Sequence, residues 1–395
     1  MENFIQKAKE IEGLIIKDRR YLHQHPEVGL NLKNTVKYVS QQLIDIGYKP
    51  EIINEAGVVA TLNSEHSGHT IMLRADMDAL PMQEESGLPF ASRIEAAHTC
   101  GHDMHTAMLL GAARIMMKYK NNYNGKVKFV FQPAEELLAG AKMMIEAGVM
   151  QNPKVEASFG MHVNSEENVG YLGYNETYTH ASSDELIITV EGKGCHGAMP
   201  EKGIDPINVA NHIYNAIQTL NAREIRSGEA AVITFGHFSG GSAMNIIPEK
   251  AVLHGTLRAY NTHIRDYIVE RMKELTENIA KAFRAKGKLV IGSSVPSLKN
   301  DSDLVKFIVN TYEKAEDFSS KNVTVRTTMG SEDFAFYTRF APAAFISLGA
   351  GTLNKSQRVS LHNPKVLFDE NALHVGSALH AMVAQKWLYE KNKED

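Results

Sequence analysis

The chain is poor in cysteine and has no long apolar run. Only Cys100 and Cys195 occur among its 395 residues, too few for the spaced disulfide framework of a secreted protein. No apolar stretch approaches the roughly 18 residues of a membrane span. Residues 1–29 are amphipathic and charged throughout, unlike the apolar core of a signal peptide. We therefore expect a cytoplasmic protein in a reducing compartment.

The chain also lacks a large excess of positive or negative charge. The chain has 42 Lys and Arg against 46 Asp and Glu, a formal net charge of −4 at pH 7. It offers no basic stripe for nucleic acid and no cluster of Lys and Arg for a membrane surface. Small molecules are therefore the expected partners, without nucleic acid or membrane.

Short apolar runs alternate with longer amphipathic runs over most of the chain. Runs of strand length lie at 57–62, 70–75, 126–131, 157–162 and 343–348. Helical patterns lie at 106–119, 137–147, 304–314 and 371–391. This alternation is typical of an α/β layer, here a mixed, largely parallel sheet flanked by helices.

Residues 184–298 follow a different order. Predicted strands lie at 185–191, 231–238, 250–260 and 289–293, and predicted helices at 206–223 and 263–286. The order β-α-β-β-α-β is that of a ferredoxin-like α+β unit. A chain of this length is expected to form two domains: 1–183 plus 299–395, and the inserted 184–298.

A thiol and three imidazoles fall within eight residues at the start of a predicted helix, in the run HTCGHDMH at 98–105. Thiolate and imidazole are ligands of borderline divalent metals, and the spacing Cys100-x-His102 lets a short segment present both at one point. We interpret this run as a metal site. The alternative is a His cluster on a solvated helix start.

Further polar residues follow the ends of predicted strands. They are Asp76, Asp78, Glu135, Glu136, His162 and His362. In open α/β sheets, ligands bind at the carboxyl edge of the strands, so these residues can converge. Taken singly, the Asp-x-Asp could form a turn, the Glu pair a solvated helix start, and each His a structural contact. Taken together, they favour a centre in which the Glu pair supplies one ligand and one base.

Nine short runs, in order, resemble a known family. They are LRADMDALP, HTCGHDMHTA, FQPAEE, GMHV, CHGAMP, AMNIIPEKA, GTLRAY, TMGSEDFAFY and SLHNP. Over nearly its whole length the chain is similar to metal-dependent amidohydrolases. These include hippurate hydrolase, auxin-conjugate hydrolases, N-acyl-amino-acid amidohydrolases and N-acetyldiaminopimelate deacetylase, which resemble two-metal carboxypeptidases and aminoacylases. The resemblance implies a metallo-exopeptidase-like catalytic domain, 1–183 plus 299–395, with 184–298 as a lid and dimerisation domain.

The resemblance also implies roles for individual residues. The implied ligands of two divalent ions are Cys100, His102, Glu136, His162 and His362. Glu135 is the implied general base. Manganese is the preferred metal, with zinc, cobalt or nickel as alternatives. Asp78 is expected to orient a ligand through a hydrogen bond.

Two positions depart from the wider carboxypeptidase relatives. They have a His where this chain has Asp76, and a carboxylate between the metals where it has Cys100. The departure fits the amidohydrolase branch and argues against ordinary zinc peptidase activity. It leaves the role of Asp76 open.

Three residues of the inserted domain carry further expectations. His196 could donate a hydrogen bond to the tetrahedral oxyanion, with a surface-turn His as the alternative. Asn245 and Arg258 resemble substrate-holding positions, because an Arg can grip a carboxylate with two hydrogen bonds; Arg258 could instead form an ion pair on a strand face. Cys195 is expected to be buried. In similar dimers the corresponding His arrives from the partner subunit, which implies a homo-oligomer, dimer or tetramer, through the lid.

These patterns favour an amidohydrolase that cleaves N-acyl L-amino acids carrying an acetyl or aromatic acyl group. Two divalent ions could hold a bridging water, lower its pKa toward ~7 and polarise the amide carbonyl. Glu135 would carry the proton from that water to the departing amine. A dipeptidase or carboxypeptidase of the same scaffold is an alternative, as is a non-catalytic metal-binding or ligand-binding protein. The presence of Glu135, which need not bind metal, favours an enzyme.

Overall fold

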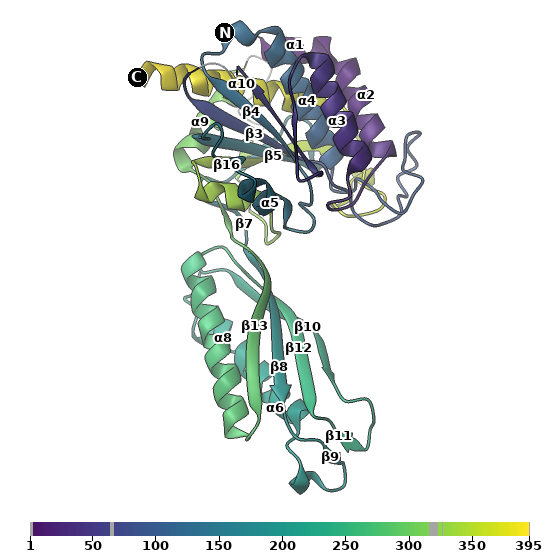
Figure 1. The fold of residues 1–395 in the computed structure, drawn as a ribbon, viewed down its shortest axis with the longest axis vertical. Coiled ribbons are helices and arrows are strands. Elements are labelled where there is room, and N and C mark those ends of the chain that lie inside the picture. Colours follow the sequence, from purple (N-terminus) through teal and green to yellow (C-terminus); the bar gives the residue numbers. More distant parts are fainter. Residues whose placement is uncertain (1–2, 64–66, 316–322, 326, 395) are drawn as a thin grey trace. The chain divides into compact units, whose positions relative to one another are not determined.

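A computed structural model describes the protein over residues 3–63, 67–315, 323–325 and 327–394. The chain divides into two compact units, each described here by itself (Figure 1). The first unit comprises Met1–Thr179, Lys299–Thr327 and Asp333–Asp395. The second comprises His180–Leu298 and the short segment Thr328–Glu332, which the sequence patterns did not assign to it.

An eight-stranded sheet forms the centre of the first unit, in the order β1-β2-β4-β3-β5-β16-β6-β15. Its strands are β1 (Glu51–Ile53), β2 (Gly57–Leu62), β3 (Thr70–Asp76), β4 (Lys126–Gln132), β5 (Ala157–Asn168), β6 (Leu172–Tyr174), β15 (Val323–Val325) and β16 (Ala343–Gly351). The four central strands β4, β3, β5 and β16 run parallel. β2 and β6 join them antiparallel on either side. The expected mixed, largely parallel sheet is confirmed.

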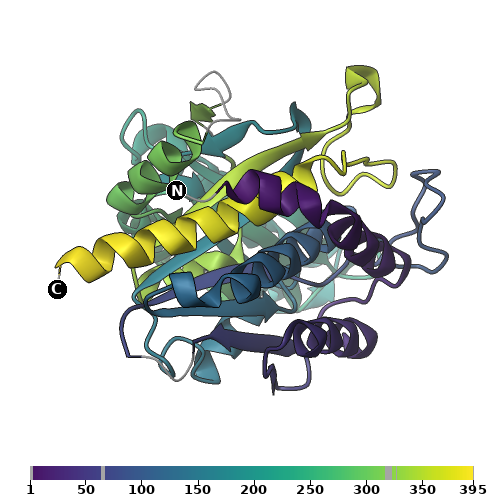
Figure 2. The ribbon, with the colours of Figure 1, turned by 90° about the horizontal axis from the view of Figure 1, so that it is seen from above.

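Helices flank this sheet. They are α1 (Phe4–Glu10), α2 (Glu12–Gln24), α3 (Lys33–Ile46), α4 (His102–Lys118), α5 (Gly140–Glu146), α9 (Ser302–Glu313) and α10 (Ala372–Glu394). α4 and α10 pack on β3 and on each other, with α1 and α2 against them (Figure 2). Every residue of β3 is buried, because a central parallel strand is covered on both faces.

Several predicted boundaries in the first unit are wrong; the helix expected from residue 106, for example, already begins at His102. The helix expected from residue 137 begins only at Gly140, because residues 135–138 form a turn with Leu138 at φ +53°. The strand expected to end at His162 continues to Asn168. Both of these segments lie beside the candidate site: a turn delays the start of α5, whereas β5 continues as a strand past His162.

The second unit has the predicted order β-α-β-β-α-β. Its main elements are β8 (Ser183–Glu191), α6 (Pro206–Gln218), β10 (Ala231–Gly240), β12 (Lys250–Ala259), α8 (Thr262–Ala282) and β13 (Lys286–Val295). The strands form an antiparallel sheet in the order β10-β12-β8-β13. α6 and α8 pack on this sheet, and the apolar side chains between the layers form a core of their own.

Smaller elements complete the second unit and the connections. They are α7 (Leu220–Arg223), β9 (Cys195–His196), β11 (Ile246–Ile247), β7 (Tyr178–His180) and β14 (Leu298–Lys299). β9 and β11 pair as a separate two-stranded ribbon, as do β7 and β14. Among the described residues, no helix is both long and apolar enough to span a membrane.

His380 supplies a test of the first unit's stability. It lies on α10, is 1% exposed, and its Nδ1 has no hydrogen-bond partner among the described residues. Its ring packs against Phe159 at 5.2 Å between centroids. Burial lowers the pKa of His380 to about 3, below the unfolded value of ~6.5. The unfolded chain therefore binds the extra proton first, and stability is lost as pH falls from 6.5 toward 3.

We predict that His380→Phe loses less stability on acidification than the original protein. Between pH 6.5 and 5, the difference in the free energy of unfolding should be on the order of 2 kcal/mol. Urea unfolding of both metal-free proteins at the two pH values measures it. The exposed His263 serves as a control, because His263→Phe should leave the pH dependence unchanged. Equal pH dependence in His380→Phe and the original protein would contradict the assignment.

Candidate metal centre

The predicted ligand residues converge at the carboxyl edge of the parallel strands of the first unit. Cys100 and His102 lie at the start of α4, Glu136 follows β4, His162 lies in β5, and His362 follows β16. Potential ligand atoms of Cys100, His102 and His162 lie within 4.8 Å of one another, and so do those of Cys100, Glu136 and His362. Other groups of potential ligands are present as well, among them Asp76, His102 and His105, but the two sets that share Cys100 consist entirely of predicted ligands.

Cys100 stands between two imidazoles. Its Sγ lies 3.3 Å from Nε2 of His162 and 3.3 Å from Nε2 of His362. Burial raises the pKa of the Cys100 thiol well above its usual value, although His102 opposes the shift. A cation at this point would stabilise the thiolate, which is the form that binds metal.

Backbone carbonyls fix the orientation of two of these imidazoles. Nδ1 of His102 donates to the carbonyl of Asp78 at 2.8 Å, and Nδ1 of His162 donates to the carbonyl of Val163 at 2.7 Å. The proton is then on Nδ1, so that each Nε2 carries the lone pair that a metal requires. Nε2 of His102 and Oε1 of Glu136 are buried without a hydrogen-bond partner among the described residues. Such orphaned buried atoms fit a bound cation.

Gly101 allows the first two ligands to be so close in sequence. It has φ +89° and caps α4, and a Cβ atom there would lie 2.4 Å from Cγ2 of Val163. Only glycine tolerates both the left-handed backbone and this approach. Gly101 therefore lets Cys100 and His102 turn toward the same point.

The Glu135-Glu136 pair lies in a tight turn and not in a solvated helix. Asp78 accepts hydrogen bonds from both backbone N–H groups, at 3.0 Å from Glu135 and 3.2 Å from Glu136. The turn closes at Gly140, where a Cβ would lie 1.6 Å from the carbonyl oxygen of Pro133. Glu135 is 6% exposed. Burial alone would raise the pKa of Glu136, but His362 and His102 outweigh it and lower that pKa.

His362 is held differently from the other ligands. Its backbone has φ +65°, a left-handed conformation that costs a non-glycine residue of order 1–3 kcal/mol and is concentrated at functional sites. Its N–H donates to the carbonyl of Thr99 at 3.1 Å, next to Cys100. The imidazole is 53% exposed and lies 3.4 Å from Oε1 of Glu136.

Sequence reasoning missed the buried polar group beneath the centre. Arg74, Asp333 and Gln132 bond to one another, and Arg74 also bonds to Asp76. His105 also bonds to Asp76. Arg74 lies inside the run LRADMDALP and Asp333 inside TMGSEDFAFY. The charge of Arg74 within an otherwise apolar predicted strand was the signal that could have identified this group.

His196 and Asn245 lie together in the second unit. β9 pairs with β11 so that Ile246 is opposite His196, and the N–H of Gly197 donates to the carbonyl of Asn245 at 2.8 Å. The N–H of Ala198 donates to Nδ1 of His196 at 3.1 Å. Neutral His196 therefore carries its proton on Nε2 and presents a donor. The approach of His196 and Asn245 to the metal centre stays a prediction.

Arg258 and Cys195 differ from their predicted surroundings. Nη1 of Arg258 donates to the carbonyl of Met329 at 3.0 Å and to Oγ of Ser331 at 2.9 Å. Within the described part of the chain, Arg258 forms no ion pair with a carboxylate, so its substrate-binding role stays a prediction. Cys195 is half-buried; the expectation of a fully buried thiol is wrong, because the two-stranded ribbon β9–β11 lacks a covering layer.

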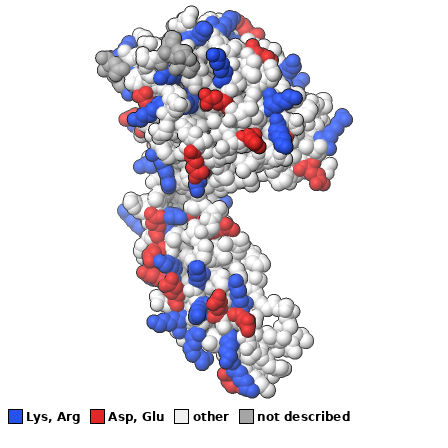
Figure 3. Space-filling view, viewed as in Figure 1, with Lys and Arg blue, Asp and Glu red and all other residues white. Residues whose placement is uncertain are grey.

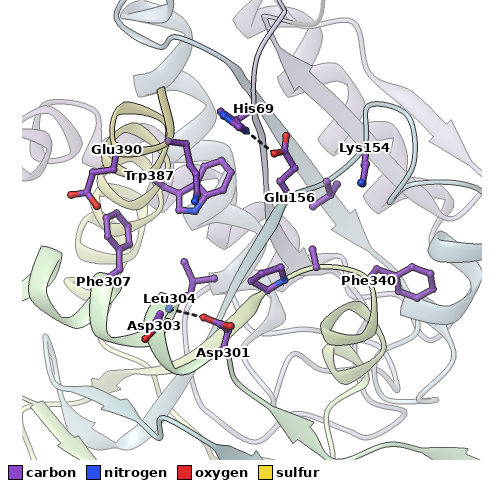
Figure 4. Close-up of a pocket in the computed structure, with 14 residues that line it drawn as sticks. His69, Lys154, Glu156, Asp301, Asp303, Leu304, Phe307, Phe340, Trp387 and Glu390 are labelled. Carbon is purple, nitrogen blue, oxygen red and sulfur yellow. Dashed lines mark hydrogen bonds and ion pairs between the residues drawn. The ribbon is translucent and has the colours of Figure 1, made fainter. Parts of the chain in front are cut away.

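A separate hollow of about 670 Å³ lies beside the starts of β3, β5 and β16, at the opposite edge of the sheet (Figure 4). Trp387 and Phe307 line it. Two of its acidic groups have local partners: Glu156 bonds to Nδ1 of His69 at 2.6 Å, and Asp301 caps α9. None of the ligand groups found among the described residues lies here, so we do not assign this hollow to the centre.

Comparison with known proteins gives three related findings. The profile of "Peptidase family M20/M25/M40" matches residues 72–386. An N-acetylcysteine deacetylase of Bacillus subtilis is 35% identical, over 95% of this chain and 97% of the relative. Hippurate hydrolase of Campylobacter jejuni is 35% identical, over 98% of this chain and 100% of the relative.

A solved structure agrees with them. It is a Bacillus subtilis protein described as a dinuclear metal-binding peptidase of the M20 family, with a TM-score of 0.84 and 31% identity. The alignment covers 96% of this chain and 99% of that one. The similarity therefore extends over both units.

The two adjacent carboxylates should differ in their effect on metal binding. We predict that Glu136→Gln lowers the number of ions bound per subunit, because it removes an anionic ligand atom beside Cys100 and His362. Glu135→Gln, a substitution of the same size next to it, should leave metal content nearly unchanged. Elemental analysis after saturation with manganese or zinc and gel filtration checks this. Equal metal loss in both variants would contradict the division of roles.

Proposed function

Because the chain belongs to peptidase family M20/M25/M40, we propose that it cleaves the amide bond of N-acyl amino acids at the metal centre of its first unit. It is a hydrolase of amide bonds, as its family is. One observation carries the proposal: two ligand sets share Cys100, and the buried Glu135 lies beside them in the turn that Asp78 holds. An acetyl or aromatic acyl group fits the names of the relatives.

The residues present fit a pair of divalent ions. Cys100, His102 and His162 would hold one ion, and Cys100, Glu136 and His362 the other. When bound, such ions lower the pKa of water toward ~7 and polarise an amide carbonyl. Manganese is the metal we propose, with zinc, cobalt and nickel also compatible with these ligands.

Glu135 moves the proton in this scheme. Its carboxylate takes a proton from the attacking water and delivers it to the amine nitrogen as the C–N bond breaks. Burial keeps bulk water from competing for that proton. Asp78 positions the base, because it accepts a hydrogen bond from the backbone N–H of Glu135.

We predict that the purified protein releases the amino acid from N-acetyl or N-benzoyl amino acids in a metal-dependent reaction. Glu135→Gln should lower kcat by about 10² to 10⁴-fold, because the amide cannot accept the proton. A panel of N-acyl amino acids and dipeptides, assayed with manganese, zinc, cobalt and nickel, measures this. Turnover restricted to dipeptides with a free amino terminus would favour a dipeptidase, and no turnover on the panel would contradict the proposal.

The second unit supplies the remaining part of the proposal. We propose that it forms a homodimer and that His196 of the partner subunit donates from Nε2 to the oxyanion. β10 is an edge strand, so its unpaired backbone groups can bond to a second copy. Exposed apolar side chains lie on and near it: Met199, Ile207, Val232, Phe238, Met244 and Ile246. On the face drawn in Figure 3, charged side chains of both signs mark the α8 side of this unit, and few mark the β10 side.

Subunit mixing tests the shared site. His196→Ala should lose about 10² to 10³-fold in turnover, as expected for one oxyanion donor, with metal binding unchanged. When it is mixed with Glu135→Gln, each mixed dimer gains one site with both groups, so about a quarter of the original activity should return at equal mixing. A mixture of Glu135→Gln with Glu136→Gln is the control and should stay inactive. Verified exchange without recovery would show that His196 does not act across subunits.

A further inference from the structure

Asp76 is completely buried at the end of β3, and both of its carboxylate oxygens have partners. Oδ2 accepts from Nη1 of Arg74 at 2.7 Å, and Oδ1 accepts from Nδ1 of His105 at 2.5 Å. The same Oδ2 lies 3.6 Å from Nε2 of His102. Asp76 therefore lies next to Nε2 of His102, at the border of one ligand set, with both of its oxygens already bonded to the protein.

His105 connects Asp76 to a ligand in β5. The backbone N–H of Val163 donates to Nε2 of His105 at 2.9 Å, so Nε2 is the acceptor and Nδ1 carries the proton to Asp76. The carbonyl of Val163 in turn accepts from Nδ1 of His162 at 2.7 Å. Because both ring nitrogens of His105 are used, His105 transmits position and does not bind metal.

A rigid frame holds Asp76 in place. Arg74 donates to Asp333 at 3.0 Å and to Oε1 of Gln132 at 3.0 Å. Gln132 also donates to Asp333 at 2.8 Å. Arg74, Gln132 and Asp333 are at most 1% exposed. The Asp76 carboxylate is therefore fixed by residues of β3, of β4 and of the segment that follows Glu332.

The other ligand set has a weaker support. His362 is largely exposed, lies on a loop in a left-handed conformation, and no described residue accepts a hydrogen bond from its Nδ1. The backbone N–H of Glu136 is held by Asp78, but its carboxylate contacts the exposed imidazole of His362, which belongs to the same set. The side chains of this set must therefore lose more conformational freedom when a metal ion binds. That loss lowers the affinity of this set for the ion.

We infer that the two metal subsites differ in affinity, and that Asp76 makes the set Cys100, His102 and His162 the tight one. Asp76 acts as a positioning residue through His105, and it is not a ligand. The inference rests on the metal centre of the proposed function. It assigns a role to Asp76, a position at which this chain departs from the wider carboxypeptidase relatives.

Titration of the metal-free protein with Co²⁺ tests the inference without turnover, because thiolate-to-cobalt absorption follows occupancy at Cys100. The original protein should bind in two steps. His362→Ala should lose the weak step and keep the tight one. Asp76→Asn should weaken the tight step by about 10 to 100-fold, as for other residues that orient metal ligands, and leave the weak step unchanged.

Two further variants guard against a general structural effect. His105→Gln keeps the Arg74–Asp76 ion pair and tests the same link if Asp76→Asn does not fold. Asp18→Asn is the matched control: Asp18 is a buried carboxylate paired with Arg114 of α4, without a contact to a ligand residue. Its titration should equal that of the original protein.

The outcomes separate the inference from the proposed function. Two equal steps in the original protein, an unchanged tight step in both Asp76→Asn and His105→Gln, or loss of the tight step in His362→Ala would each overturn the inference alone. An original protein that binds no Co²⁺ would overturn the metal centre and the proposed function with it.

Discussion

The carboxylate of Asp78 sets the spacing between the two halves of the metal centre. It accepts from the N–H groups of Glu135 and Glu136, while the carbonyl of the same residue accepts from His102. Asp78, shortly after β3, thus holds the proposed base Glu135, a proposed ligand of each set and the tautomer of His102. Each of these bonds has a backbone group as one partner. The geometry of the centre therefore depends on the turn at residues 135–138 and on the segment after β3 more than on flexible side chains.

Buried charge surrounds this edge on more than one side. Besides the Arg74 frame, Arg19 and His23 both bond to Asp103 at 2.9 Å, directly after His102. Removing one partner of a buried ion pair typically costs about 3–5 kcal/mol, although such pairs contribute little net stability against apolar replacements. Their presence near the ligands is therefore better explained by the positions that they impose. Arg74 and the imidazoles of His102 and His105 hold the pKa of Asp76 well below its usual value against the effect of burial.

The two units divide the proposed work. All proposed ligands and the proposed base belong to the first unit, with its own large core, while His196 and Asn245 belong to the second. A separate core lets the second unit keep its β-α-β-β-α-β fold as an insertion. If sites are shared between subunits as proposed, the second unit has two functions. It carries His196 as the oxyanion donor, and it carries the edge strand β10 through which a second copy can bind.

Much of the fold follows from local patterns. Apolar runs with period 2 or 3.6 locate the strands and helices to within a few residues, and the run at 98–105 identifies Cys100 and His102 as ligand candidates, because these signals depend on neighbours in the chain. The tertiary structure alone decided which distant groups meet. Cys100 and His362, 262 positions apart, come together only because β3 and β16 both run parallel to β5, so that the segments following them lie at the same edge of the sheet. The same holds for Asp76, since its bond to His105 depends on how β3 and α4 pack. Periodicity carries no information about such contacts between elements.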